Sequence, residues 1–181
     1  MNLLILSCGT RNKIVQYFKQ ELGDRGQIMA TDCSELAPAL YDADKHFIVP
    51  RMNDDGYLDV ILNICKENNI KGVLSLIDPE LSLLAENKEA FLEIGTTPII
   101  SEYDLVEMCF DKYQFYEFLI ENGFKTIRSY IDEELFYKDI DAGLIEYPVF
   151  VKPVRGSASI NISKVTTKEE IELLFSRYDN L

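Results

Sequence analysis

The feature that most constrains the fold is an alternation over the first hundred residues. Short apolar runs alternate with segments whose apolar residues recur every three or four positions, which is the spacing of one helix face. The runs are continuously apolar, as is typical of strands covered on both faces, and the short strand–helix–strand spacing favours parallel pairing through right-handed crossovers. The pattern therefore predicts an α/β fold with a doubly wound, Rossmann-like parallel sheet. The expected strands are residues 3–6, 27–31, 47–49, 72–77 and 98–100.

The pattern changes beyond residue 100. Helical spacing predicts a helix over 111–122, with Gly123 in the position that a helix C-terminus prefers. A capping box at Thr167 and Glu170 is expected to begin the last helix. The apolar face of this last helix would consist of Ile171, Leu174, Phe175 and Tyr178. Between the two helices, strands are expected at 126–131, 149–152 and 159–165 around a helical insert near 133–141. We therefore expect two domains, residues 1–108 and residues 109–181.

Charge and hydropathy exclude some classes of partner. The chain carries 31 Asp and Glu against 18 Lys and Arg, a net charge of −13. Because phosphate contacts dominate affinity for nucleic acids, DNA, RNA and anionic membrane surfaces are not expected as partners. The apolar start of the chain lacks the basic residues and the length of a signal peptide, and no stretch approaches the ~20 apolar residues of a membrane span. A cytoplasmic protein is therefore expected.

Cysteine and histidine are too sparse for a zinc site. Cys8, Cys33, Cys65 and Cys109 lie far apart without a C-x-x-C pair, and His46 is the only histidine. We interpret the cysteines as free, buried thiols in a reducing cytosol. The acidic run at 132–134 is more often a solvated face than a metal site, so no metal ligand is assigned.

The turn after the first expected strand is one candidate site. Ser7-Cys8-Gly9-Thr10-Arg11 follows that strand, and Asp32 ends the second, an arrangement similar to a dinucleotide-binding fold. A dinucleotide fingerprint needs G-x-G-x-x-G so that the backbone can approach the pyrophosphate, and only Gly9 is present among those positions. A tight strand-to-helix turn is thus favoured over NAD or FAD binding.

Two acidic residues follow the fourth expected strand. Asp78 and Glu80 stand at its carboxyl end, where open α/β sheets bind their ligands. We therefore expect Asp78 and Glu80, together with Gly9, to contact a substrate.

The most informative segment is Tyr147-Pro-Val-Phe-Val-Lys152-Pro153 and the small-residue loop after it. A lysine among apolar strand neighbours is costly to desolvate unless an anion meets it, and backbone N–H groups of such a loop can close over phosphate oxygens. Together they favour a nucleotide phosphate site, to which Lys112 would add a second cation. Alternatively, Lys152 reaches solvent from an edge strand and residues 156–159 form an ordinary hairpin turn.

In combination, these segments resemble the start of an ATP-grasp enzyme. Asp111-Lys112 begins a helix, Gly123-Phe-Lys-Thr126 forms the turn after it, and the Tyr147–Pro153 segment precedes a Gly/Ser loop. The sequence of the first domain, for example Leu76-Ile-Asp-Pro-Glu-Leu81, is similar to the sequences of proteins described as carbamoyl phosphate synthase large subunit-like. The resemblance covers essentially the whole chain. It implies a Rossmann-like pre-ATP-grasp domain followed by the first, small α+β subdomain of an ATP-grasp fold.

The resemblance also implies a chemistry. Lys112 and Lys152 would contact the phosphates of ATP, and a flap would cover the nucleotide. The flap residues would be Gly156, Ser157, Ala158 and Ser159. A carboxylate substrate would be activated as an acyl phosphate and then attacked by an amine or a similar nucleophile. Family members often carry glycine at positions 158 and 161, and carbamoyl phosphate synthases have arginine in place of the two lysines.

The family's second lobe and its magnesium carboxylates would lie beyond Leu181. No catalytic or metal-binding residue is therefore expected within the chain, which alone should be inactive. Whether a second chain supplies the rest of the domain, and whether the protein forms a homodimer, stays open. Two other functions stay open as well: a non-catalytic binding module that keeps the fold, and a Rossmann-type cofactor binder that uses Gly9 and Asp32.

Overall fold

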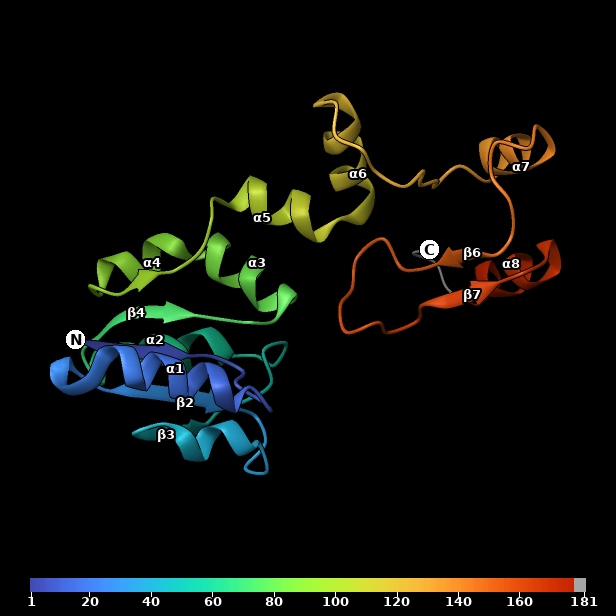
Figure 1. The fold of residues 1–181 in the computed structure, drawn as a ribbon. Helices are drawn as coiled ribbons and strands as arrows, with labels where there is room; N and C mark the ends of the chain where they lie inside the picture. Colours follow the sequence, from blue (N-terminus) through green and yellow to red (C-terminus); the bar gives the residue numbers. More distant parts are fainter. Residues whose placement is uncertain (178–181) are drawn as a thin grey trace. The chain divides into compact units, whose positions relative to one another are not determined.

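The computed structural model describes residues 1–177 of the 181-residue chain. The chain divides after Val106 into a first unit, Met1–Val106, and a second unit that begins at Glu107. The boundary expected after residue 108 lies in the same helix, α5 (Tyr103–Phe110). Each unit has its own sheet (Figure 1).

The first unit is built on a five-stranded parallel sheet in the order β3-β2-β1-β4-β5. The α/β fold expected from the sequence is thus confirmed. Because the chain passes from β3 back across β1 to β4, strand order reverses between β1 and β4, and this is the position where open α/β sheets bind ligands. The strands are β1 (Asn2–Ile5), β2 (Ile28–Asp32), β3 (Lys45–Ile48), β4 (Ile70–Leu74) and β5 (Thr97–Pro98).

Helices cover both faces of this sheet because successive strand residues point to opposite sides. On one face Leu4 and Leu6 belong to a buried cluster with residues of α2, α3 and α4. On the other face Leu3 and Ile5 pack with residues of α1 and of the short helix η2. Figure 1 shows α1 in front of the strands and α2 behind them. The helical elements are α1 (Asn12–Leu22), η1 (Gly23–Arg25), η2 (Pro38–Asp42), α2 (Tyr57–Glu67), α3 (Asp78–Glu86) and α4 (Lys88–Glu93).

The second unit contains three helices and an antiparallel pair of strands within residues 107–177, besides the end of α5. The helices are α6 (Lys112–Glu121), α7 (Glu133–Asp141) and α8 (Lys168–Phe175), and the strands are β6 (Val149–Val151) and β7 (Ser163–Val165). The helical insert expected near 133–141 is confirmed as α7. Tyr178, the last apolar residue expected on the final helix, lies outside the described residues.

Three strand predictions in the second unit need correction. The strand expected at 126–131 is wrong, because this segment pairs with no strand and Ile127 is 85% exposed. The strand expected at 149–152 ends at Val151, so Lys152 follows β6 rather than lying within it. The strand expected at 159–165 begins only at Ser163, because Ser159 and Asn161 have positive φ angles that a strand does not allow.

The helix ends of the second unit follow the sequence signals. Asp111 caps α6 by accepting hydrogen bonds from the N–H groups of Tyr113 and Gln114, and Gly123 after the helix has a φ of +73°. Thr167 accepts a bond from the N–H of Glu170, as a capping box requires, at 3.4 Å. In the reciprocal bond, the Glu170 carboxylate accepts from the N–H of Thr166, one position earlier than in the standard motif.

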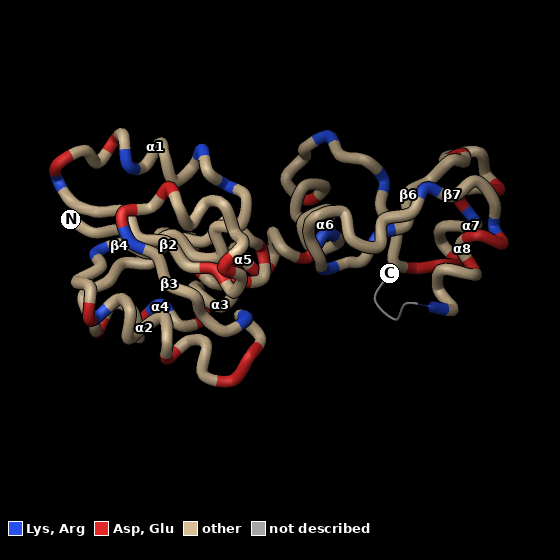
Figure 2. The backbone as a smooth tube through the Cα atoms, turned by 90° about the horizontal axis from the view of Figure 1, so that it is seen from below, with Lys and Arg blue, Asp and Glu red and all other residues tan. Residues whose placement is uncertain are grey.

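Acidic and basic residues are interspersed along the backbone of both units (Figure 2). Of the helices in residues 1–177, none is long and apolar enough to cross a membrane.

Candidate functional site

The loop after β1 places Gly9 and Asp32 in contact. The N–H of Gly9 donates to Oδ2 of Asp32 at 2.8 Å, and the N–H of Ser34 donates to Oδ1 of the same carboxylate at 2.9 Å. Both carboxylate oxygens therefore hold backbone groups of the two loops. Gly9 has a φ of +51°, a conformation that favours glycine. This arrangement is the tight strand-to-helix turn that the sequence favoured.

Arg11 connects the two sides of the switch point between β1 and β4. One guanidinium nitrogen donates to the carbonyl of Ser7 and the other to the carbonyl of Leu76, both at 3.3 Å. The side chain is only half-buried. The guanidinium is thereby held at the carboxyl edge of the sheet, where the sequence led us to expect a substrate. Sequence reasoning assigned no role to Arg11.

Glu80 lies beneath this edge, fully buried in the first turn of α3. Its Oε1 accepts hydrogen bonds from the hydroxyl of Ser7, at 2.9 Å, and from the hydroxyl of Tyr57. Its Oε2 accepts a bond from the hydroxyl of Ser75 at 2.5 Å. The carboxylate thus joins the ends of β1 and β4 to the start of α2. Burial, and then the neighbouring Glu80 charge, raise the pKa of Tyr57 above its ordinary value, so Tyr57 keeps the proton that it donates.

Asp78 differs from Glu80 in exposure. It is the first residue of α3 and is exposed to solvent. Of the two acidic residues assigned to a substrate, Asp78 is therefore the one that a dissolved molecule can reach, whereas the carboxylate of Glu80 contacts protein hydroxyls.

In the second unit, Lys112 contacts the loop that was assigned as the flap. Lys112 is the first residue of α6, and its backbone N–H donates to the carbonyl of Val154 at 3.0 Å. Its Nζ donates to the carbonyls of Gly156 at 2.8 Å and of Val154 at 3.3 Å. Two segments 44 positions apart in the sequence, the helix start and the loop after β6, are thereby joined.

Lys152 follows β6 and is exposed. Phe150, within β6, is 66% exposed and lies opposite Lys164 of β7. Sequence reasoning missed Phe150 and Lys164. The signal that could have found Phe150 is its two-residue spacing from Lys152, because an exposed aromatic ring beside a cation is a surface on which a flat, charged ligand can rest.

The loop from 156 to 161 has an unusual backbone. Gly156 has a φ of +144°, and Ala158, Ser159 and Asn161 have φ angles between +55° and +59°. Residues with a Cβ rarely adopt such angles, although asparagine does so more often than most. The glycines that family members often carry at positions 158 and 161 would suit this backbone.

Ion pairs tie the same loop to the end of α5. Arg155 contacts the carboxylate of Glu107 at 2.6 Å and that of Asp111 at 3.5 Å, and its guanidinium lies over the Phe110 ring at 5.6 Å. Since Asp111 also caps α6, its carboxylate contacts both Arg155 at the start of the loop and the first turn of the helix.

Within residues 1–177, no three His, Cys, Asp or Glu side chains gather as a metal site. The chain's cationic groups and its small-residue loop are donors suited to phosphate oxygens.

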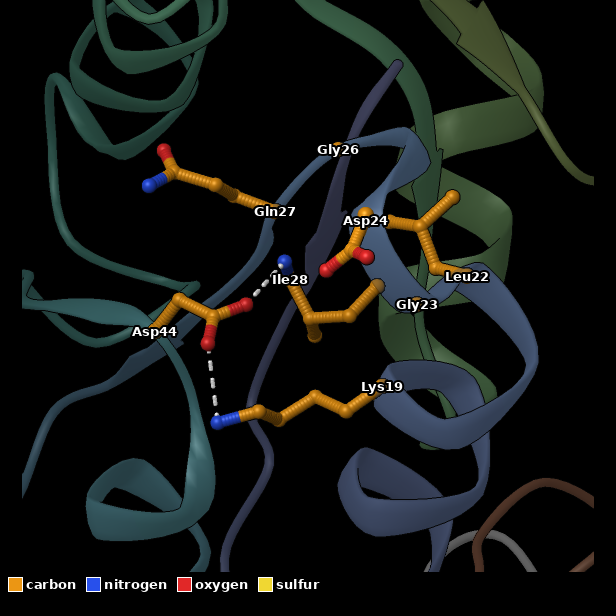
Figure 3. Close-up of a pocket in the computed structure, with 8 residues that line it drawn as sticks. All are labelled: Lys19, Leu22, Gly23, Asp24, Gly26, Gln27, Ile28 and Asp44. Atoms are coloured by element: carbon orange, nitrogen blue, oxygen red, sulfur yellow. Dashed lines mark hydrogen bonds and ion pairs between the residues drawn. The ribbon is translucent and has the colours of Figure 1, made fainter.

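A hollow of about 280 Å³ lies at the opposite, amino edge of the five-stranded sheet (Figure 3). Lys19 and Asp44 face each other across it and form an ion pair of 2.8 Å, and the N–H of Ile28 donates to the same carboxylate. The Lys19, Asp44 and Ile28 groups therefore satisfy one another, and none of the residues assigned to a site lines this hollow.

Solved structures share this fold. The chain is similar to the L-amino acid ligase of Bacillus licheniformis, with 20% identity and a TM-score of 0.68 over 99% of this chain and 42% of that one. It is similar to N5-carboxyaminoimidazole synthetase of Staphylococcus aureus, with 19% identity and a TM-score of 0.65 over 97% and 43%. It is also similar to the biotin carboxylase domain of the 2-oxoglutarate carboxylase of Hydrogenobacter thermophilus, with 23% identity and a TM-score of 0.66 over 97% and 39%. That domain was solved as a dimer with MgADP, ADP and bicarbonate.

These likenesses show that the chain shares the fold of the corresponding part of each of these proteins, and they confirm the α/β fold that the sequence led us to expect. The chain spans about two fifths of the length of each of these three proteins. A search of curated proteins finds no match. A family model described as "PylC-like, N-terminal domain" matches residues 3–99, which include most of β1 and all of β2 to β5. With more than half of its length matched and the matching sheet in place, the chain belongs to the family of PylC-like N-terminal domains.

Proposed function

We propose that the chain is the N-terminal portion of an ATP-dependent ligase of the ATP-grasp class. In this reaction a carboxylate is activated by ATP as an acyl phosphate, and an amine or a similar nucleophile then displaces the phosphate. The observation that carries the proposal is in the second unit, where Lys112 is bonded to the carbonyl of Gly156 at the start of the small-residue loop. A cation and a loop of this kind are what a nucleotide phosphate site requires.

The comparisons support the same class. Two of the three structurally similar proteins are a ligase and a synthetase, and the third was solved with MgADP. We propose that Lys112 and Lys152 contact the phosphates, that residues 156–159 cover them, and that Phe150 lies against the base. The adenine-hinge residues, magnesium ligands and second lobe would come from further residues or from a second chain. A carbamoyl phosphate synthase-like substrate is the narrower form of the proposal.

The carboxyl edge of the first unit is our proposed place for a substrate other than ATP. Gly9, Arg11 and the exposed Asp78 lie in the segments that follow β1 and β4. This assignment depends on the general position of ligands at switch points in open α/β sheets.

The test is Lys152→Met in the complete enzyme, measured as ADP release in the presence of magnesium and pairs of carboxylates and amines. A charge-assisted phosphate contact contributes about 1.5 to 3 kcal/mol, so kcat/KM for ATP is expected to fall by about ten-fold or more. Lys138→Met, which removes a lysine of α7 outside the proposed site, is the matched control and should leave ATP use unchanged. ATP kinetics that stay the same in Lys152→Met would refute the assignment. If no pair of carboxylate and amine leads to ADP release, the result would favour a non-catalytic binding module.

A further inference from the structure

The carboxylate of Glu80 is buried without a cation among the partners that the structure shows. Its hydrogen bonds come from three hydroxyl groups, on Ser7, Tyr57 and Ser75. A buried carboxylate that accepts several hydrogen bonds is costly to disturb, because losing a donor leaves part of a charge unsatisfied. Such a group therefore fixes the positions of the residues that donate hydrogen bonds to it.

Ser7 is the donor that links Glu80 to the loop after β1. It stands between β1 and the turn at Gly9, and its backbone has a φ of +42°, which a residue with a Cβ adopts only at a cost in free energy. Its hydroxyl is bonded to Glu80, and its carbonyl accepts the guanidinium of Arg11. The bond to Glu80 thus holds Ser7 in the conformation that directs the chain toward Gly9 and Arg11.

We infer that Glu80 is a positioning residue, which acts through the hydroxyl of Ser7 to fix the loop after β1 at the switch point of the sheet. Glu80 does not contact the substrate. It sets the places of Gly9 and Arg11, the loop residues to which a substrate has access. The link from this loop to substrate affinity rests on the proposed function, whereas the link from Glu80 to the loop does not.

The two serine hydroxyls separate positioning from general stability. Ser75 is bonded to the opposite oxygen of Glu80, and its own oxygen accepts the N–H of Ile77, so it belongs to the loop after β4. Ser75→Ala should therefore loosen the loop at Ile77 and leave the loop at Gly9 in place. Ser7→Ala should do the reverse, although both substitutions remove one hydroxyl from the same carboxylate.

The experiment measures amide hydrogen exchange in the 181-residue chain, which needs no turnover. Ser7→Ala and Glu80→Met, each of which removes the bond between the two side chains, are expected to speed exchange at the N–H groups of Gly9 and Arg11 by about ten-fold or more, as the loss of a hydrogen bond to a carboxylate predicts. In the double variant the rate should match the faster single variant, because both changes remove the same bond. Ser75→Ala should speed exchange at Ile77 but not at Gly9.

Unchanged exchange at Gly9 in Ser7→Ala would overturn the inference. Glu80→Met is the more disruptive change, and if it does not fold, Ser7→Ala decides alone, since it leaves two donors on Glu80. In the complete enzyme Ser7→Ala should raise the KM for the substrate other than ATP and leave the KM for ATP unchanged. Loss of the exchange effect refutes the positioning role even if the enzyme is a ligase, and absence of ligase activity leaves the exchange result intact.

Discussion

Two of the four cysteines are expected to resist alkylation in the folded chain. Cys8 and Cys65 are buried, whereas Cys33 and Cys109 are exposed, so the expectation of buried thiols is wrong for these two. Burial raises the pKa of the Cys65 thiol from 9.0 to about 12 and, with the nearby Asp32 charge, that of Cys8 to about 11. Since the thiolate is the nucleophile, the reactive fraction at pH 8 falls about a thousand-fold for Cys65 and about a hundred-fold for Cys8 relative to an unperturbed thiol.

The assay is timed alkylation with iodoacetamide at pH 8, followed by peptide mapping by mass spectrometry. Cys33 and Cys109 should be labelled in the first samples. Cys8 and Cys65 should be labelled only as the first unit opens, so that urea brings all four rates together. If Cys65 is modified within a few-fold of the rate of Cys33 without denaturant, the packing of α2 on the sheet is not as described.

The same thiols predict a loss of stability at alkaline pH. Because their pKa values are raised on folding, the folded chain binds these two protons more tightly than the unfolded chain does. The stabilisation is complete below pH 9 and is lost as the pH rises from about 9 to about 12, where the unfolded chain holds fewer protons. The urea midpoint should fall across this range, and it should fall less steeply in Cys65→Ala than in the matched control Cys33→Ala.

Further substitutions at three positions test other features. Asp111→Ala removes the two capping bonds of α6 and should cost about 1 kcal/mol, seen as faster amide exchange in its first turn, whereas Asp111→Asn should retain most of the cap. Ala158→Gly relieves a φ of +55° and should stabilise the loop by up to about 1 kcal/mol in urea unfolding; a destabilised variant would contradict this backbone. Lys19→Met breaks a half-exposed ion pair and should cost no more than about 1 kcal/mol. Burial opposes ionisation of Asp44, but Lys19 and the N–H of Ile28 outweigh it and lower the pKa of Asp44, so the wild-type contribution should fade as the pH drops below about 4 and be absent in the variant.

Sequence periodicity was sufficient for the first unit and for several helix ends of the second. Leu3–Leu6 is continuously apolar because its alternate residues enter two different buried clusters, and that pattern predicts a strand covered on both faces. Asp111, Gly123 and Thr167 act through neighbours within a few positions, so their signals can be found locally.

The failures involve partners that a local pattern does not contain. A strand needs a neighbour for its hydrogen bonds, and the segment at 126–131 pairs with no strand despite its isoleucines. Glu80 has the appearance of an ordinary acidic residue in the first turn of a helix, and only the fold brings Ser7 and Tyr57 to it, from 73 and 23 positions away.

The strand order has a consequence for the order in which the protein can be built during synthesis. β1 is made first and is central, and every later strand pairs with one that precedes it in the sequence: β2 with β1, β3 with β2, β4 with β1 and β5 with β4. After β1, each new strand of the first unit finds a partner that the ribosome has already made. The first unit can therefore assemble vectorially, strand by strand, as it leaves the exit tunnel.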